Sequence, residues 1–284
     1  MRSLHDVPAP AKLNLFLHIT GRRPDGYHLI ESVFMLIDWQ DRLHFELRAD
    51  GAVTREDLGG MRLPEDDLIV RAARALQAAT GCSAGAHIGV EKSIPAQAGM
   101  GGGSSDAAST LLALNRLWKL HLPRPALEAI GLQLGADVPF FLRGRNAWVQ
   151  GIGDIITPLE GAQQLPPQRF MVVKPAAGLE TKSIFSAPDL QRDSERATIA
   201  VFAAKHYDFG QNNLQPVAEK LCPDVKKAID WLEAHGLHGR MTGSGSAVFA
   251  PMRQTAEMTD APSGWESRVC HNLEVHPLAG WAKD

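Results

Sequence analysis

Apolar and polar residues alternate along residues 7–20 in the way that a β-strand requires. One face of this predicted strand carries Leu13, Leu15, Leu17 and Ile19, and the other carries Lys12, Asn14, Phe16 and His18. Residues 21–28 have the composition of a turn. Two further strands are predicted at residues 32–39 and 41–48. The chain is therefore expected to begin with β structure.

Amphipathic segments with helical periodicity follow in the first half of the chain. The first of them can be capped by Asp66 or Asp67 and is ended by Gly81. In chain order, the pattern predicts a helix at 68–80, a strand at 86–94, helices at 107–120 and 125–134, and a strand or hairpin at 148–156.

The second half begins after residues 158–168, which are rich in proline, glycine and glutamine and are predicted to be a domain linker. Beyond it, the pattern predicts strands at 169–174, 247–250 and 267–275 and helices at 214–221 and 225–235. Strands and helices in mixed order predict an α+β fold. We therefore expect two domains, residues 1–157 and residues 169–284.

The composition of the 284-residue chain is that of an ordinary globular protein. A formal net charge of −3 argues against a broadly basic surface, and hence against nucleic acid as a partner. No apolar run has the length of a signal peptide or a membrane span. The three cysteines are few and widely spaced, which is typical of a reducing compartment. We expect a cytoplasmic protein that is a monomer or a weak homodimer.

Residues 95–108, with the sequence PAQAGMGGGSSDAA, concentrate four glycines between a predicted strand and a predicted helix. Glycine is retained in such a loop where the backbone needs a positive φ or approaches a ligand closely. Ser104, Ser105 and Asp106 are suitable N-caps for the helix that follows, so free N–H groups would face the loop. Such an arrangement is typical of a phosphate-binding loop.

Other interpretations of this loop fit less well. A Walker A loop requires a lysine directly after its last glycine, and none is present. A dinucleotide-binding fingerprint that starts at Gly99 requires glycine at the position of Ser104. A flexible linker would not be flanked by an apolar strand and an amphipathic helix. An anion-binding loop is therefore the preferred interpretation.

Three further features could carry chemistry. Asp137, in the sequence GADVP, is either a general base or a local cap, and capping is the commoner role of a lone aspartate. Lys12 is either solvated at a strand edge or stabilises charge in a phosphate site. Residues 241–250 contain a second glycine-rich turn. Taken alone it is a tight turn, but two such loops favour a shared phosphate site.

Three motifs together resemble the GHMP kinase superfamily: residues 10–15 (PAKLNL), residues 95–108, and residues 242–246 (TGSGS). The resemblance implies a two-domain α+β fold. Its N-terminal domain would be of the ribosomal-protein-S5-domain-2 type and its C-terminal domain ferredoxin-like, with the active site in the cleft between them. It also implies transfer of a phosphoryl group from ATP to a small alcohol, with Mg²⁺ as the counter-ion of the phosphates.

The resemblance also implies roles for individual residues. Asp137 matches the catalytic base of the family, and Lys12 matches its partner lysine. The implied ATP-binding residues are Pro95, Ala96, Gln97, Ala98, Gly99, Met100, Gly101, Gly102, Gly103, Ser104 and Ser105. A further glycine motif comprises Thr242, Gly243, Ser244 and Gly245. The resemblance assigns no metal ligands.

Residues 11–28 and 135–139 narrow the resemblance to the branch that phosphorylates the 2-hydroxyl of a cytidyl-linked alcohol in isoprenoid biosynthesis. The implied substrate-binding residues are Asn14, Tyr27, His28, Thr181 and Phe185, with the rings of Tyr27 and Phe185 on the two faces of cytosine. A kinase for another small alcohol, such as mevalonate, homoserine or a sugar, is the alternative within the superfamily. A catalytically silent phosphate-binding protein is the alternative outside it.

Two residues depart from the family pattern. Gln97 stands where glycine is usual, which predicts a tighter or displaced first turn of the loop. Asp67 stands where asparagine is common, and a carboxylate cannot donate a hydrogen bond to a nucleotide. Neither departure affects Lys12 or Asp137.

Overall fold

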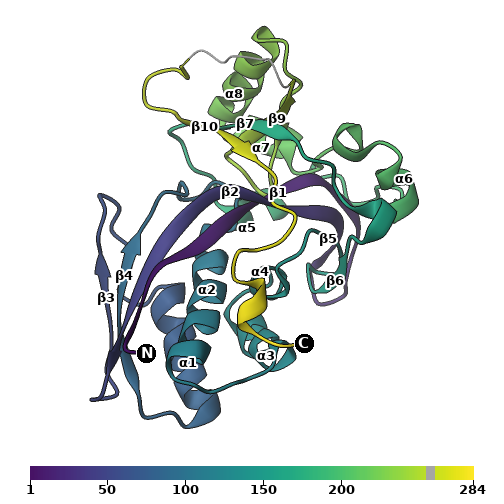
Figure 1. Cartoon of the computed structure of the whole chain (residues 1–284). Coiled ribbons are helices and arrows are strands. Elements are labelled where there is room, and N and C mark those ends of the chain that lie inside the picture. The colour runs from purple at the N-terminus through teal and green to yellow at the C-terminus, as the bar shows by residue number, and fades with distance from the viewer. Residues whose placement is uncertain (254–259) are drawn as a thin grey trace.

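The computed structural model describes residues 1–253 and 260–284, and their strands form two sheets (Figure 1). The six-stranded sheet contains β1 (Ser3–Arg22), β2 (His28–Arg48), β3 (Val53–Asp57), β4 (Gly85–Glu91), β5 (Ala147–Gln150) and β6 (Ile155–Pro158). The four-stranded sheet contains β7 (Arg169–Lys174), β8 (Arg240–Met241), β9 (Val248–Met252) and β10 (Glu266–His271).

Eight α-helices lie within the described residues. Those of the first half are α1 (Leu68–Thr80), α2 (Gly102–Leu117), α3 (Arg124–Leu134) and α4 (Val138–Arg143). Those of the second half are α5 (Thr181–Phe185), α6 (Ile199–Ala203), α7 (Gln215–Leu221) and α8 (Pro223–Ala234). Short 3₁₀ turns occur at η1 (Gly161–Gln163), η2 (His206–Asp208) and η3 (Ala279–Trp281). The mixed architecture confirms the predicted α+β fold.

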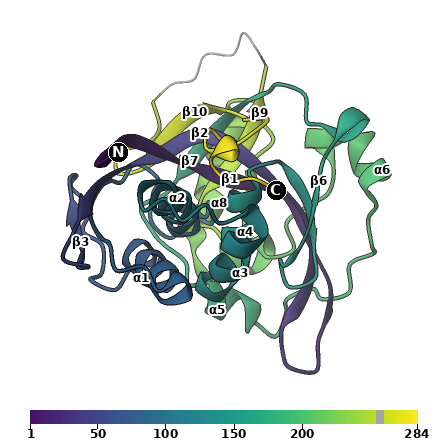
Figure 2. The same ribbon diagram turned by 60° about the horizontal axis from the view of Figure 1, so that its bottom comes forward.

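The long antiparallel strands β1 and β2 form the middle layer of the molecule. Helices α1–α4 lie on one side of them, and the second sheet lies on the other (Figures 1 and 2). Phe34 and Leu36 of β2 pack with the helices, whereas Val33 and Met35 pack with Phe170 of β7. Because both sides of these strands are covered, nearly all of their central residues are buried.

The alternation predicted for β1 is therefore only partly right. Phe16, expected on the polar face, is fully buried and packs in the same apolar cluster as Leu13 and Leu15. The pairing of β1 with β2 shifts register between Asn14 and Leu17. A bulge of this kind re-aims the side chains that follow it, and a period-2 pattern does not predict it.

The two strands predicted at 32–39 and 41–48 are a single strand, β2, which changes neighbours along its length. Residues 32–34 pair with β5, and residues 42–48 pair with β4. Only residue 40 separated the two predicted strands, and aspartate is seldom buried inside a strand. Asp41 is nevertheless fully buried, and its carboxylate accepts hydrogen bonds from the backbone of Ser93 and Ile94.

Other local predictions are confirmed. The N-cap of α1 is Asp67, whose side chain accepts a hydrogen bond from the Val70 N–H, and Gly81 ends the helix with φ +66°. Residues 147–158 form a hairpin where a strand or hairpin was predicted at 148–156. None of the helices in the described part of the chain is long and apolar enough to cross a membrane.

The C-terminal residues return to the first half of the chain. Leu278 and Ala282 join the apolar cluster beneath α1–α4, and the guanidinium of Arg124 donates to the carbonyl oxygens of Ala279 and Ala282. Residues 159–168 lie between the two sheets in the chain order. The domain limits expected from the sequence stay a prediction.

Candidate active site

The glycine-rich segment ends in α2, which begins at Gly102 rather than at the predicted Ala107. Its N-cap is Gly101, with φ +72°, and Ser104, Ser105 and Asp106 lie inside the first turns instead of capping the helix. A left-handed N-cap favours glycine, so the structural start lies before the polar residues that resemble caps. The N–H groups of the first turn therefore belong to the glycine segment itself, where they can bind phosphate.

The two glycine-rich segments pack directly against each other. A Cβ atom at Gly99 would lie 2.3 Å from the carbonyl oxygen of Thr242, so only glycine fits there. The backbone N–H of Ser246 donates to the carbonyl oxygen of Gln97 at 3.0 Å. Gln97 itself has φ +51°, the left-handed conformation that a glycine would adopt at low cost. The second glycine turn thus supports the first.

A cavity of about 500 Å³ opens beside the glycine segment, towards the start of α1. All of the residues expected to bind ATP line it except Ser105. The hydroxyl of Ser105 is buried and donates to the carbonyl oxygen of Pro10 at 2.7 Å. Ser105 therefore holds α2 against β1 and does not face the cavity.

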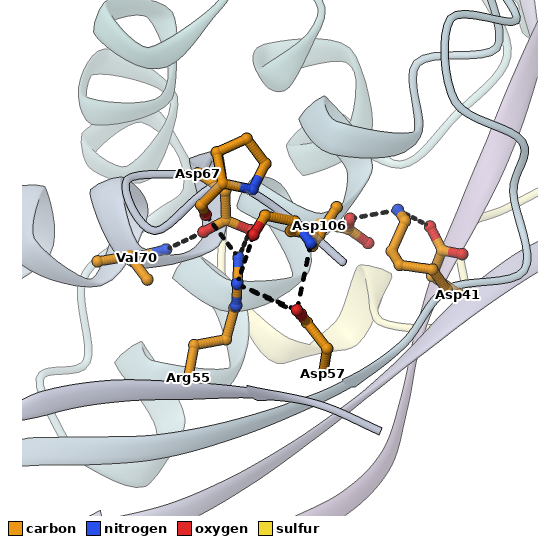
Figure 3. Close-up of polar contacts among 9 residues, drawn as sticks. Asp41, Arg55, Asp57, Asp67, Val70 and Asp106 are labelled. Atoms are coloured by element: carbon orange, nitrogen blue, oxygen red, sulfur yellow. Dashed lines mark hydrogen bonds and ion pairs between the residues drawn. The ribbon is translucent and has the colours of Figure 1, made fainter. Parts of the chain in front are cut away.

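Two ion-pair clusters border this cavity (Figure 3). In the first, the guanidinium of Arg55 lies 2.9 Å from Asp67 and 3.3 Å from Asp57. The carboxylate of Asp67 thus both caps α1 and pairs with Arg55. This arrangement gives aspartate a structural role at the position where the family pattern has asparagine.

In the second cluster, the ammonium of Lys92 lies between two buried carboxylates. These belong to Asp41 and Asp106, which are labelled in Figure 3. Its Nζ is 2.6 Å from Asp106 Oδ2. Burial raises the pKa of Asp106, and the neighbouring Asp41 raises it further, whereas Lys92 opposes the change. Sequence reasoning missed this cluster because its members lie on β2, at the end of β4 and on α2, with no local motif.

The two residues expected to be catalytic lie together. Lys12 Nζ is 3.6 Å from Asp137 Oδ2 and 4.6 Å from the centre of the Phe34 ring. It also donates a hydrogen bond to Asn14 Oδ1. Burial lowers the pKa of Lys12, and the charge of Asp137 opposes that shift. Asp137 is the N-cap residue of α4, yet its side chain makes no capping hydrogen bond, so its carboxylate is available to a ligand.

Asn14 connects this pair to the second glycine turn. Its backbone N–H donates to Thr242 Oγ1 at 2.8 Å, and its side-chain amide donates to Ser32 Oγ at 3.0 Å. The backbone N–H of Lys12 in turn donates to the carbonyl oxygen of Met100. The three motifs singled out in the sequence therefore converge on one place in the fold.

The other residues expected to bind the substrate lie on α5 or beside its C-terminal end. At its start, Thr181 Oγ1 lies 2.7 Å from Ser244 Oγ, and at its end the Phe185 ring lies 5.1 Å from the His28 ring. Tyr27, His28 and Phe185 line a second cavity of about 490 Å³. Tyr27 is 61% exposed, so its ring is accessible to a ligand.

Both halves of the chain match known protein families. The model described as GHMP kinases N terminal domain matches residues 67–145, and that described as GHMP kinases C terminal matches residues 192–267. The 4-diphosphocytidyl-2-C-methyl-D-erythritol kinases of Delftia acidovorans and Paracidovorax citrulli are each 72% identical over 284 residues, covering 100% of this chain and 99% of each relative.

Solved structures of kinases are also similar to this chain. A crystal structure of 4-(cytidine 5'-diphospho)-2C-methyl-D-erythritol kinase superimposes with a TM-score of 0.74 and 29% identity, covering 95% of this chain and 99% of that one. Homoserine kinase from Cytophaga hutchinsonii, at 16% identity and a TM-score of 0.67, shares the fold and covers 97% and 96% of the two chains. The chain is a small-molecule kinase of the GHMP type and belongs to the family of 4-diphosphocytidyl-2-C-methyl-D-erythritol kinases.

Proposed function

We propose that this enzyme transfers the γ-phosphoryl group of ATP to the 2-hydroxyl of 4-diphosphocytidyl-2-C-methyl-D-erythritol, giving the 2-phosphate and ADP. The reaction belongs to the non-mevalonate route to isoprenoid precursors. The observation that carries the proposal is the convergence of Lys12, Asp137 and the glycine-rich segment, next to a separate cavity lined by Tyr27 and Phe185.

The phosphates of ATP are assigned to the N-terminus of α2. Its first N–H groups come from glycines and are not covered by a capping side chain. The positive end of the helix dipole adds a favourable field for anions. The nucleoside is assigned to the cavity beside α1, because that cavity is continuous with the glycine-rich segment and includes the apolar side chains of Leu68 and Ile69.

Asp137 and Lys12 are assigned to the reacting hydroxyl. The carboxylate of Asp137 would accept the proton of the acceptor hydroxyl, or orient that hydroxyl towards the γ-phosphorus. The buried ammonium of Lys12, held by Asn14 and Asp137, would stabilise the negative charge on the attacking oxygen and the transferring group. Phosphoryl transfer depends mainly on such positioning and electrostatic stabilisation.

Mg²⁺ is expected to accompany ATP. Within the described residues no cluster of three His, Cys, Asp or Glu side chains could hold an ion. The site nevertheless fits Mg²⁺, which typically uses phosphate oxygens, waters and one or two protein oxygens. Ser104 lines the cavity, and its hydroxyl oxygen would lie 3.7 Å from a Cβ atom on Gly135, two residues before Asp137. The oxygens of Asp137 and Ser104 would therefore be the candidate ligands in this chain. When bound, the ion would neutralise phosphate charge.

The cytidyl group is assigned to the cavity at the end of α5. This helix has five residues, so Thr181 and Phe185 are separated by about 6 Å along its axis. One end of α5 contacts the second glycine turn and the other carries the aromatic ring. Stacking of a base on an aromatic side chain contributes about 1–3 kcal/mol, which favours a cytidyl substrate over a simple alcohol.

The test is release of ADP from ATP and Mg²⁺ with the cytidyl compound, compared with mevalonate, homoserine and galactose. We expect turnover with the cytidyl compound alone. Turnover with another acceptor instead would keep the kinase and reject the assigned substrate. If a folded protein binds ATP but phosphorylates none of the four compounds, the proposed activity is wrong.

A further inference from the structure

Arg192 lines the cytidyl cavity together with His28 and Phe185 and was not singled out by any sequence motif. Its Nε–H group donates a hydrogen bond to Nε2 of His28 at 3.1 Å. A guanidinium has only donors and stays charged at all relevant pH values. Nε2 of His28 must therefore be the acceptor, so the ring is neutral and its proton is on Nδ1.

The guanidinium of Arg192 is itself fixed by the chain that follows α5. Its two terminal nitrogens donate to the carbonyl oxygens of Leu190 at 3.0 Å, Ala187 at 2.7 Å and Phe185 at 3.4 Å. The side chain is half-buried. Arg192 thus fixes both the backbone of Phe185 and the ring of His28. The rings of Phe185 and His28 lie 5.1 Å apart.

The charges around His28 favour the neutral ring as well. Arg22 on β1, Lys182 on α5 and Arg192 all line the same cavity, and Asp25 in the adjoining turn is paired with Arg23. Burial lowers the pKa of His28, and Arg192 and Arg22 lower it further. His28 Nδ1 has no hydrogen-bond partner among the described residues, so its proton is available to a ligand in the cavity.

We propose that Arg192 is a positioning residue for base selection, which holds His28 in the Nδ1–H form so that it presents a hydrogen-bond donor to the pyrimidine. A donor opposite N3 pairs with cytosine, whose N3 is an acceptor, and opposes uracil, whose N3 carries hydrogen. The identity of the base rests on the proposed function, whereas the protonation state of His28 does not. The tautomer and the base preference can therefore be tested separately.

The first test is long-range ¹H–¹⁵N NMR of the whole protein, with the His28 signals assigned by comparison with His28→Gln. In the unaltered protein at pH 7.5 we expect a neutral ring protonated on Nδ1. In Arg192→Gln we expect a mixture of the two neutral tautomers and a raised pKa. A ring protonated on Nε2, or a charged ring, in the unaltered protein would overturn the proposal.

The second test compares steady-state kinetics of Arg192→Gln and Arg192→Lys. Loss of one positioned hydrogen bond should raise KM for the cytidyl substrate about three- to tenfold in Arg192→Gln. The kcat value and KM for ATP should not change. Arg192→Lys should partly restore KM, because an ammonium can still donate to Nε2. Equal losses in kcat and in KM for both substrates would indicate a merely structural role and contradict the proposal.

The pH dependence of KM in Arg192→Gln distinguishes a positioning role from a merely structural one. A protonated imidazole carries hydrogen on both nitrogens, so the KM defect of Arg192→Gln should shrink as pH falls from about 8 to about 6. Inhibition by CDP and by UDP should be compared in the same variants. The preference for CDP over UDP should be reduced in Arg192→Gln and retained in Arg196→Gln, an exposed neighbour. An unchanged preference in Arg192→Gln would refute the assignment. Absence of kinase activity in the unaltered protein would refute the proposed function but leave the NMR test valid.

Discussion

The ammonium nitrogen of Lys12 lies 3.6 Å from a carboxylate oxygen of Asp137, although the two residues belong to different ends of the first half of the chain. The environments differ: the Lys12 side chain is 5% exposed and that of Asp137 is 30% exposed. The lysine is therefore held inside the fold, while the aspartate is partly exposed and accessible to a ligand. This asymmetry suits a fixed positive charge and an accessible proton acceptor.

Replacement of Asp137 by asparagine should reduce kcat by about a hundredfold to ten-thousandfold, because a positioned base contributes that much to rate. The fold should be retained, since the Asp137 side chain caps no helix. Single-turnover kinetics and thermal unfolding measure the two effects. Asp6→Asn is the matched control, because Asp6 is exposed at the far end of β1. Near-normal kcat in Asp137→Asn would remove this residue from the mechanism.

Replacement of Phe185 by alanine should raise KM for the cytidyl substrate about 5- to 150-fold, which corresponds to loss of about 1–3 kcal/mol of stacking. KM for ATP should stay the same, because Phe185 does not line the cavity assigned to ATP. Trp231→Ala, a half-buried aromatic residue of α8 outside both cavities, is the control. An unaltered KM for the cytidyl substrate would rule out the stacking role.

Replacement of Gln97 by valine should destabilise the protein by about 1–2 kcal/mol, because a β-branched residue is strained at φ +51°. Gln97→Gly should be neutral or slightly stabilising for the same reason. KM for ATP should rise severalfold in the valine variant, since this residue lines the cavity and holds Ser246. Chemical denaturation and ATP titration measure these effects, and Gln164→Val, at an exposed position with φ −58°, is the control. Equal stability of the valine and glycine variants would show that the backbone carries no strain here.

The protein should lose stability in mild acid through His276. Burial, with a smaller effect of Arg124, lowers the pKa of His276 to about 3. Its Nδ1 accepts a hydrogen bond from the Leu278 N–H, so the ring is neutral in the folded state. The unfolded chain takes up a proton below about pH 6.5, so the free energy of unfolding falls as pH decreases below that value. The contribution at pH 5 is about 2 kcal/mol.

The measurement is denaturant unfolding at several pH values between 7.5 and 5. The slope of stability against pH should be smaller in His276→Gln than in the unaltered protein. His238→Gln, at an exposed position, should keep the original slope. If all three proteins lose stability equally, another group is responsible for the acid effect.

Much of the site was predictable because its signals are local. Asp67 caps α1 and Gly81 ends it, and each of these signals depends only on neighbouring residues in the sequence. The glycine-rich segment indicated phosphate binding because its glycines permit positive φ angles and a close approach of the backbone to a ligand. Lys12 and Asp137 were identified by motif resemblance, and the structure brings them within 3.6 Å of each other.

The sequence by itself determined most of the longer helices and strands and the class of chemistry, because helix caps and glycine-rich turns depend on neighbours a few residues away. It did not predict β3, α4, α5 or α6. Only the tertiary structure decided that α2 begins at Gly102, that β2 is one strand, and that Lys92 lies between two buried carboxylates. It also placed Arg192 against His28. These features depend on contacts between distant segments, whose energies come from burial and pairing in the folded chain and leave no periodic trace in the sequence.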